Sequence, residues 1–104
     1  MMDRKAYLEK MEAQLREWKA EVDAMSARAD KARADAKIEL NRQVSDLRTK
    51  YDRLRERFED LKTAGEKAYD KLREGFEAAV REFTSAFERT SVASRGETAT
   101  TARR

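Results

Sequence analysis

Apolar side chains in the first sixty residues recur at alternating spacings of three and four positions, and this pattern constrains the fold more than any other feature. The first set of such residues is Leu8, Met11, Leu15, Trp18, Val22 and Met25, continued by Ala29, Ala32 and Ala36. The second set is Leu40, Val44, Leu47, Tyr51, Leu54, Phe58 and Leu61. Spacings of three and four place side chains on one face of an α-helix and are typical of coiled coils. The sequence therefore predicts an all-α fold with one long helix over about residues 4–62.

The two apolar sets are out of phase by one residue. A strict seven-residue repeat continued from the first set would reach Glu39 and Gln43, whereas the apolar residues are Leu40 and Val44. The intervening stretch 27–37, ARADKARADAK, contains no Gly or Pro, and alanine is the best helix former. We therefore expect a continuous helix with a local change of supercoil rather than a turn. The small side chains fit a narrow waist in a bundle, and a hinge or a notch for a partner is the alternative.

A break is expected after the second apolar set, at Thr63-Ala64-Gly65-Glu66. Gly65 lowers helix propensity, and the spacing of Thr63 and Glu66 fits a capping box. The sequence predicts a tight turn at 62–65, and a straight rod running through Gly65 is the competing interpretation.

The residues after this turn predict a second, shorter helix over about 65–90, with an internal 11-residue repeat. A long helix that doubles back on a short one makes a coiled-coil hairpin. Its predicted core is Leu47, Tyr51, Leu54, Phe58, Leu61, Leu72, Phe76, Phe83 and Phe87. Residues 91–104 are rich in Ser, Thr and Ala, so we expect a flexible, disordered tail there.

The composition excludes several kinds of chemistry. The chain has no Cys and no His, so it has no thiolate nucleophile, no disulfide and no imidazole base or metal ligand. We expect no catalytic, cofactor-binding or metal-binding residues, and no enzymatic activity. Acidic and basic residues are interleaved through the 43% of the chain that is charged, which does not favour nucleic-acid binding. No stretch reaches the ~20 apolar residues that a membrane span needs, and we expect a cytoplasmic protein.

The unequal lengths of the two expected helices predict self-association. A helix over 4–62 would be ~85 Å long, against ~35 Å for the second, so the first apolar set would stay uncovered within one chain. Exposed apolar stripes usually mark interfaces. The predicted self-association seam is Leu8, Met11, Leu15, Trp18, Val22 and Met25, in an antiparallel homodimer.

We therefore expect a non-catalytic coiled-coil scaffold or protein-interaction module, with an unidentified protein partner as a further option. The alternative is a coat on a lipid or granule surface, which would use the aromatic face of the second helix.

Two resemblances accompany this interpretation. The run Tyr7-Leu8-Glu9-Lys10-Met11-Glu12-Ala13-Gln14-Leu15-Arg16-Glu17-Trp18, together with Ala34-Asp35-Ala36-Lys37-Ile38-Glu39-Leu40, resembles a group of small bacterial proteins described as coiled-coil domain proteins. This resemblance covers about residues 3–88 and implies no chemistry. The second helix is similar to the 11-residue amphipathic repeats of apolipoproteins and desiccation proteins, although its aromatic residues depart from the Ala-rich faces of the latter.

Overall fold

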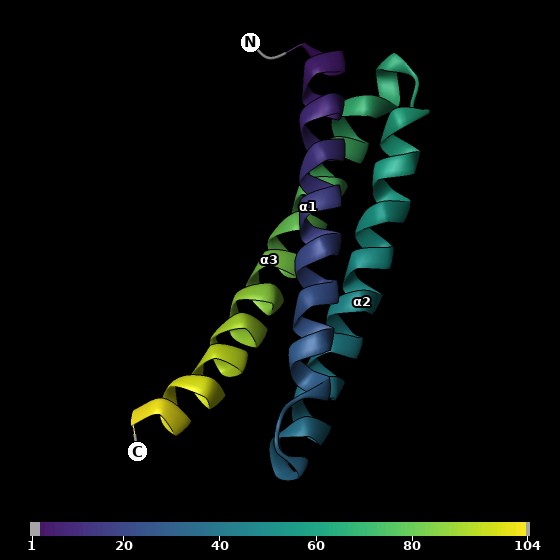
Figure 1. Ribbon diagram of the computed structural model, residues 1–104. Helices are drawn as coiled ribbons and strands as arrows, with labels where there is room; N and C mark the ends of the chain where they lie inside the picture. Colours follow the sequence, from purple (N-terminus) through teal and green to yellow (C-terminus); the bar gives the residue numbers. More distant parts are fainter. Residues whose placement is uncertain (1–2, 104) are drawn as a thin grey trace.

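The protein is all-α over the part of the chain that the structure describes. The computed structural model describes the backbone of residues 3–103 and the side chains of residues 3–93. Three helices follow one another: α1 (Arg4–Asp30), α2 (Ala34–Lys62) and α3 (Glu66–Arg103). α1 and α2 run antiparallel, and α3 turns back along both of them (Figure 1). The result is an elongated three-helix bundle with extents of 56 × 22 × 17 Å.

The expectation of one continuous helix over residues 4–62 was wrong. The helix breaks at residues 31–33, inside the Ala-rich stretch. Lys31 keeps φ −94° and ψ −3°, whereas Arg33 is extended, with φ −62° and ψ 154°. No described residue has a positive φ, so this turn requires no glycine. It therefore leaves none of the Gly or Pro signals by which turns are usually found in a sequence.

The break is favoured because it lets α1 fold back onto the rest of the chain. Leu15, Val22 and Met25 on α1 are 0%, 2% and 3% exposed in the folded chain. Burying each such side chain stabilises the fold by about 1.5–3 kcal/mol. Taking three residues out of a helix forfeits only a few tenths of a kcal/mol of helix propensity per residue. Tertiary packing therefore outweighs the local preference for helix.

The second break, at residues 63–65, lies within the segment where the sequence predicts a turn. Thr63 does not form the expected capping box. Its hydroxyl donates to the carbonyl oxygens of Glu59 and Asp60, both at 3.3 Å, and so provides hydrogen-bond donors for the last carbonyl groups of α2. The start of α3 is closed instead by the Gly65 carbonyl, which accepts from the backbone N–H groups of Ala68 and Tyr69.

The flexible tail is not confirmed, because α3 continues as a helix through residue 91 to Arg103. Thr90 is 3% exposed, and its hydroxyl donates to the Ala86 carbonyl at 3.0 Å, so packing continues to the expected start of the tail. The C-terminal part of α3 diverges from the α1–α2 pair (Figure 1). The tail side chains from residue 94 onward lie outside the described residues.

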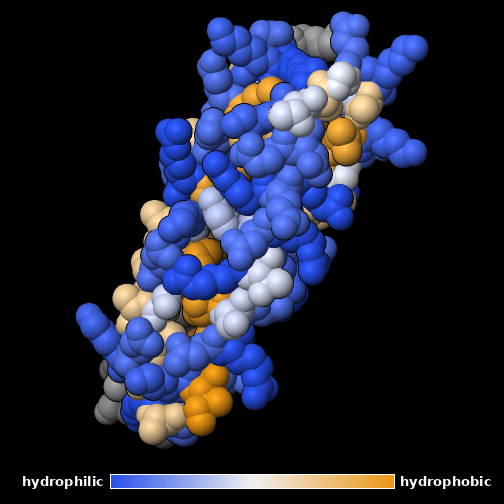
Figure 2. Space-filling view, turned by 90° about the vertical axis from the view of Figure 1, so that its right-hand side faces the viewer, coloured by the Kyte–Doolittle hydropathy of each residue, from blue (hydrophilic) through white to orange (hydrophobic). Residues whose placement is uncertain are grey.

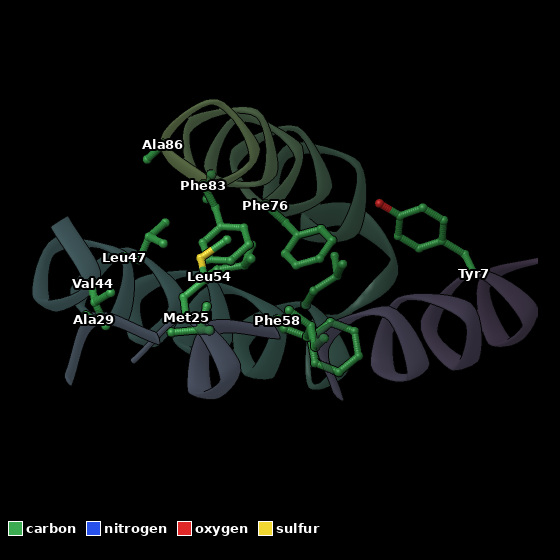
Figure 3. Packing of buried hydrophobic residues seen from close by; sticks show 14 of the residues in the cluster. Tyr7, Met25, Ala29, Val44, Leu47, Leu54, Phe58, Phe76, Phe83 and Ala86 are labelled. Atoms are coloured by element: carbon green, nitrogen blue, oxygen red, sulfur yellow. The ribbon is translucent and has the colours of Figure 1, made fainter. Parts of the chain in front are cut away.

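The core runs along the length of the bundle and draws on all three helices. Phe76 and Phe83 project from α3 toward the other two helices (Figure 3) and are fully buried, as is Phe58 on α2. The face seen in Figure 2 is mostly hydrophilic, with hydrophobic side chains in small, separate patches. The bundle therefore places most of its large apolar side chains inside, and Ile38 and Val92 are the exposed ones among the described residues.

Candidate functional site

The candidate site is the surface along which α1 packs on the α2–α3 hairpin, because it holds the apolar seam that the sequence marks for association. Leu15, Val22 and Met25 are buried there, and Leu8, Met11 and Trp18 are partly buried against the same core. The covering side chains belong to the same chain. The reason for expecting a dimer, an uncovered seam, is therefore removed by the break at residues 31–33.

Aromatic contacts join the middle of α1 to both other helices. The Trp18 ring lies 5.3 Å, centroid to centroid, from the ring of Phe83 on α3. Phe83 in turn lies 6.2 Å from Tyr51, whose hydroxyl donates to the Leu15 carbonyl at 3.2 Å. Tilted and edge-on ring pairs of this kind contribute about 0.5–1.5 kcal/mol each beyond the area they bury. The groove between α2 and α3 thus fits the aromatic side chain of α1 as well as its aliphatic ones.

Arg4 fastens the N-terminal end of α1 to the turn between the other two helices. Its Nη2 donates to the carbonyl oxygens of Leu61, Lys62 and Ala64, at 3.2, 3.4 and 2.7 Å. Its guanidinium also lies 4.4 Å from the centre of the Tyr69 ring. The last carbonyls of a helix have no intrahelical donor and carry the negative end of the helix dipole, so a cation is stabilising there. Arg4 therefore acts as a capping group for α2 that is supplied by α1.

Tyr7 makes the second attachment of this end, to α3. Its hydroxyl donates to Glu77 Oε2 at 2.9 Å, and Arg73 donates to the same oxygen at 3.2 Å. The Arg73 guanidinium also lies 4.1 Å from the centre of the Tyr7 ring, and the ring packs edge-on against Phe76. Figure 3 shows Tyr7 at one end of the cluster, with its hydroxyl turned toward α3.

The titration behaviour of this group follows from its contacts. Burial, followed by the hydrogen bond to Glu77, raises the pKa of Tyr7 to about 12. The same carboxylate raises the pKa of Arg73. Tyr7 is therefore protonated at neutral pH and serves as a hydrogen-bond donor rather than as a base or nucleophile.

Ion pairs between helices lie nearer the surface. Arg48 on α2 contacts Asp23 on α1 at 3.0 Å, and this contact lowers the pKa of the Asp23 carboxyl. Arg53 on α2 and Glu82 on α3 are 3.9 Å apart. Exposed pairs of this kind contribute little to stability.

A groove of about 440 Å³ opens beside this attachment, between the start of α1 and the end of α2. Leu8 and Phe58 line its apolar part. The charged lining carries both signs: Asp3, Arg4, Lys5, Glu9, Glu12 and Lys62. Mixed charges do not select an anion or a cation.

Among the side chains of residues 3–93, no three Asp or Glu carboxylates come together as a metal site would need. None of the described helices combines the length and the hydropathy of a membrane-spanning segment.

The expected hairpin core comes together as one cluster with the α1 seam: Leu47, Leu54, Phe58, Leu61, Phe76 and Phe83 are buried, and Tyr51, Leu72 and Phe87 are partly buried against them. Of the expected turn residues, Thr63 and Gly65 lie in the turn and Glu66 begins α3.

The polar residues that attach α1 to the other helices were not among the residues predicted from the sequence. Tyr7 had a signal, since it lies four residues before Met11 and so shares its helix face. Arg73 and Glu77 had the spacing of a helical ion pair. Arg4 had no signal, because its partners are carbonyl oxygens that only the tertiary fold brings near.

Comparisons of this chain with protein-family models, with curated proteins and with solved structures find no match.

Proposed function

We propose that the protein is a non-catalytic helical scaffold, or protein-interaction module, that self-associates through its apolar helix faces. The observation that carries this proposal is the fit of α1 into the groove between α2 and α3. An amphipathic helix lying in an apolar groove is a recurring mode of protein–protein recognition. Here the chain supplies both the helix and the groove, so a second copy offers the same two surfaces.

The polar chemistry of the groove supports a structural role. Among the side chains of residues 3–93, those with a shifted pKa are Tyr7, Asp23 and Arg73. Tyr7 and Arg73 bridge α1 to α3 through Glu77, and Asp23 bridges α1 to α2. Structural ion-pair networks perturb pKa values as active sites do. Each of these three groups lies at a contact between two helices.

The burial of the aromatic residues favours the scaffold over the lipid or granule coat. Phe76 and Phe83 are 0% exposed and are covered by the other helices. A coat that used this face would have to separate α3 from the bundle before it met a lipid surface, and would lose the ring contacts of Trp18 and Tyr51.

The test is the mass in solution, measured by light scattering over a wide concentration range, with and without anionic vesicles. We expect a concentration-dependent dimer whose mass and helix content do not respond to vesicles. A monomer at every concentration, combined with co-sedimentation with vesicles, would reject the scaffold in favour of the coat.

A further inference from the structure

A strict seven-residue repeat places the two apolar sets one residue out of phase, but at the 3.6 residues per turn of a straight helix the buried faces of α1 and α2 point in the same direction. At about 100° per residue, a continuous helix through residues 31–33 would bring the buried residues of both helices into a single arc about 100° wide. These residues are Leu15, Val22, Met25 and Ala29 on α1, and Leu40, Val44, Leu47, Leu54, Phe58 and Leu61 on α2. Two helices joined by a turn have no need of a common phase, because the turn can reset it. A straight helix does need one.

The link itself departs little from a helix. Lys31 stays in the helical region, and the N–H groups of Lys31 and Ala32 already donate to the carbonyls of Arg28 and Ala29. Arg33 leaves the helical region through its ψ of 154°. Returning that ψ to about −40° would bring Arg33 back into the helical region, as a single helix through α1 and α2 requires. The residues around the link, mostly Ala, Lys and Arg, favour that state.

α1 is also the helix best suited to leave. It packs less extensively on the other two helices than those helices pack on each other. Its polar attachments, Arg4 to the end of α2 and Tyr7 to Glu77, form discrete sets that a second chain can reproduce without change.

From these observations we propose that the protein dimerises by exchanging α1. In each chain the link at 31–33 straightens, and α1 of one copy occupies the groove between α2 and α3 of the other. Every contact of α1 with α2 and α3 is then remade between chains, and each link gains helical hydrogen bonds. Short connections whose sequence favours helix over a turn promote this kind of exchange, which is known as domain swapping. The two straight helices pass each other at Ala29, Ala32 and Ala36, whose small side chains allow close approach. This inference rests on the proposed self-association and specifies its geometry.

The substitution Ala34→Pro tests the link. Ala34 is the first residue of α2, where proline is favoured, and Arg33 before it already has the extended conformation that precedes a proline. The closed monomer therefore accommodates the change, and the exposed position of Ala34 leaves room for the ring. In the straight helix the same proline lies in the interior. Proline costs about 3 kcal/mol there, or about 140-fold per chain, so dimerisation should weaken on the order of 10⁴-fold.

The matched control is Glu66→Pro, which places proline at the first residue of α3. The turn at residues 63–65 that precedes it keeps its conformation in the exchanged dimer. We expect this variant to dimerise as the parent does. Both variants are refolded from urea at high concentration, and their masses are measured by light scattering.

A cross-link shows which chain each α1 occupies. The chain has no cysteine, so Asp23→Cys with Arg48→Cys places the only two thiols across the α1–α2 contact, where the two parent side chains meet at 3.0 Å. A short bis-maleimide should join two chains covalently in the isolated dimer and should close a single chain in the monomer.

Covalent dimers that disappear with Ala34→Pro and persist with Glu66→Pro would establish the exchange. A dimer that cross-links only within each chain, or that survives Ala34→Pro, would overturn the exchange and leave self-association standing. A monomer at all concentrations would overturn both.

Discussion

The substitution Phe83→Ala tests most directly whether the aromatic face of α3 is the centre of the bundle. Phe83 is 0% exposed, and its ring lies within 5.3, 5.8 and 6.2 Å of the rings of Trp18, Phe87 and Tyr51. These neighbours come from all three helices. A cavity left there can therefore close only if the helices move.

We expect this variant to lose about 4 kcal/mol of unfolding free energy, since a buried Phe→Ala change costs about 3–5 kcal/mol and this site cannot collapse easily. For a domain of this size, each kcal/mol lowers the melting temperature by about 4–8 °C, so the midpoint should fall by at least about 15 °C. Urea unfolding followed by far-ultraviolet circular dichroism measures the free energy. Phe83→Leu keeps part of the side-chain volume and should give an intermediate loss.

The matched control is Val92→Ala on the same helix, at a side chain that is 60% exposed. It should change the unfolding free energy by no more than about 0.5 kcal/mol. If the unfolding free energies of Phe83→Ala and Val92→Ala differed by less than about 1 kcal/mol, Phe83 would not lie at the centre of the bundle, because removing a ring packed by three helices costs more than that.

Three further outcomes are expected at the α1 attachment. Arg4→Gln should destabilise the protein by about 1–3 kcal/mol in urea unfolding, because it removes the donor to three carbonyls. Arg4→Lys should restore only part of the loss, since an ammonium cannot stack on the Tyr69 ring as the planar guanidinium does; equal stability of the three proteins would contradict the capping role. Because the pKa of Tyr7 is raised to about 12 in the fold, against about 10 in an unfolded chain, its contribution should be complete below pH 10 and lost as pH rises toward 12. Tyr7→Phe should flatten that decline in unfolding free energy, and an unchanged alkaline profile would show that Tyr7 is not responsible for it. Trp18 packs on Phe83 of its own chain in the monomer and on Phe83 of the partner chain after exchange, so its fluorescence maximum should not move on dilution; a red shift at low concentration would show that the Trp18 ring is covered only on association.

The residues that attach α1 to the other helices show which contacts a sequence pattern can indicate and which depend on the tertiary fold. Tyr7, Arg73 and Glu77 lie at helical spacings that a sequence displays, but nothing in the sequence says that they meet. Arg4 shows no pattern at all, because backbone carbonyls at the end of α2 are its partners. Residues that act on the backbone of another element cannot be read from residue types and spacings.

By itself the sequence determined that the described chain is helical and which side chains turn inward, because spacings of three and four fix a helix face whatever lies against it. It also predicted a break near Gly65, where low helix propensity coincides with the end of an apolar set, although it left a straight rod as the competing interpretation. Only the tertiary structure decided the break at residues 31–33 and the partner of the α1 seam. That turn uses backbone angles open to every residue, in a stretch whose local preference is helical, so the decision lay with the burial of Leu15, Val22 and Met25 against α2 and α3. A spacing pattern predicts that the apolar face of a helix is buried, but the pattern is the same whether the helices that bury it belong to the same chain or to another.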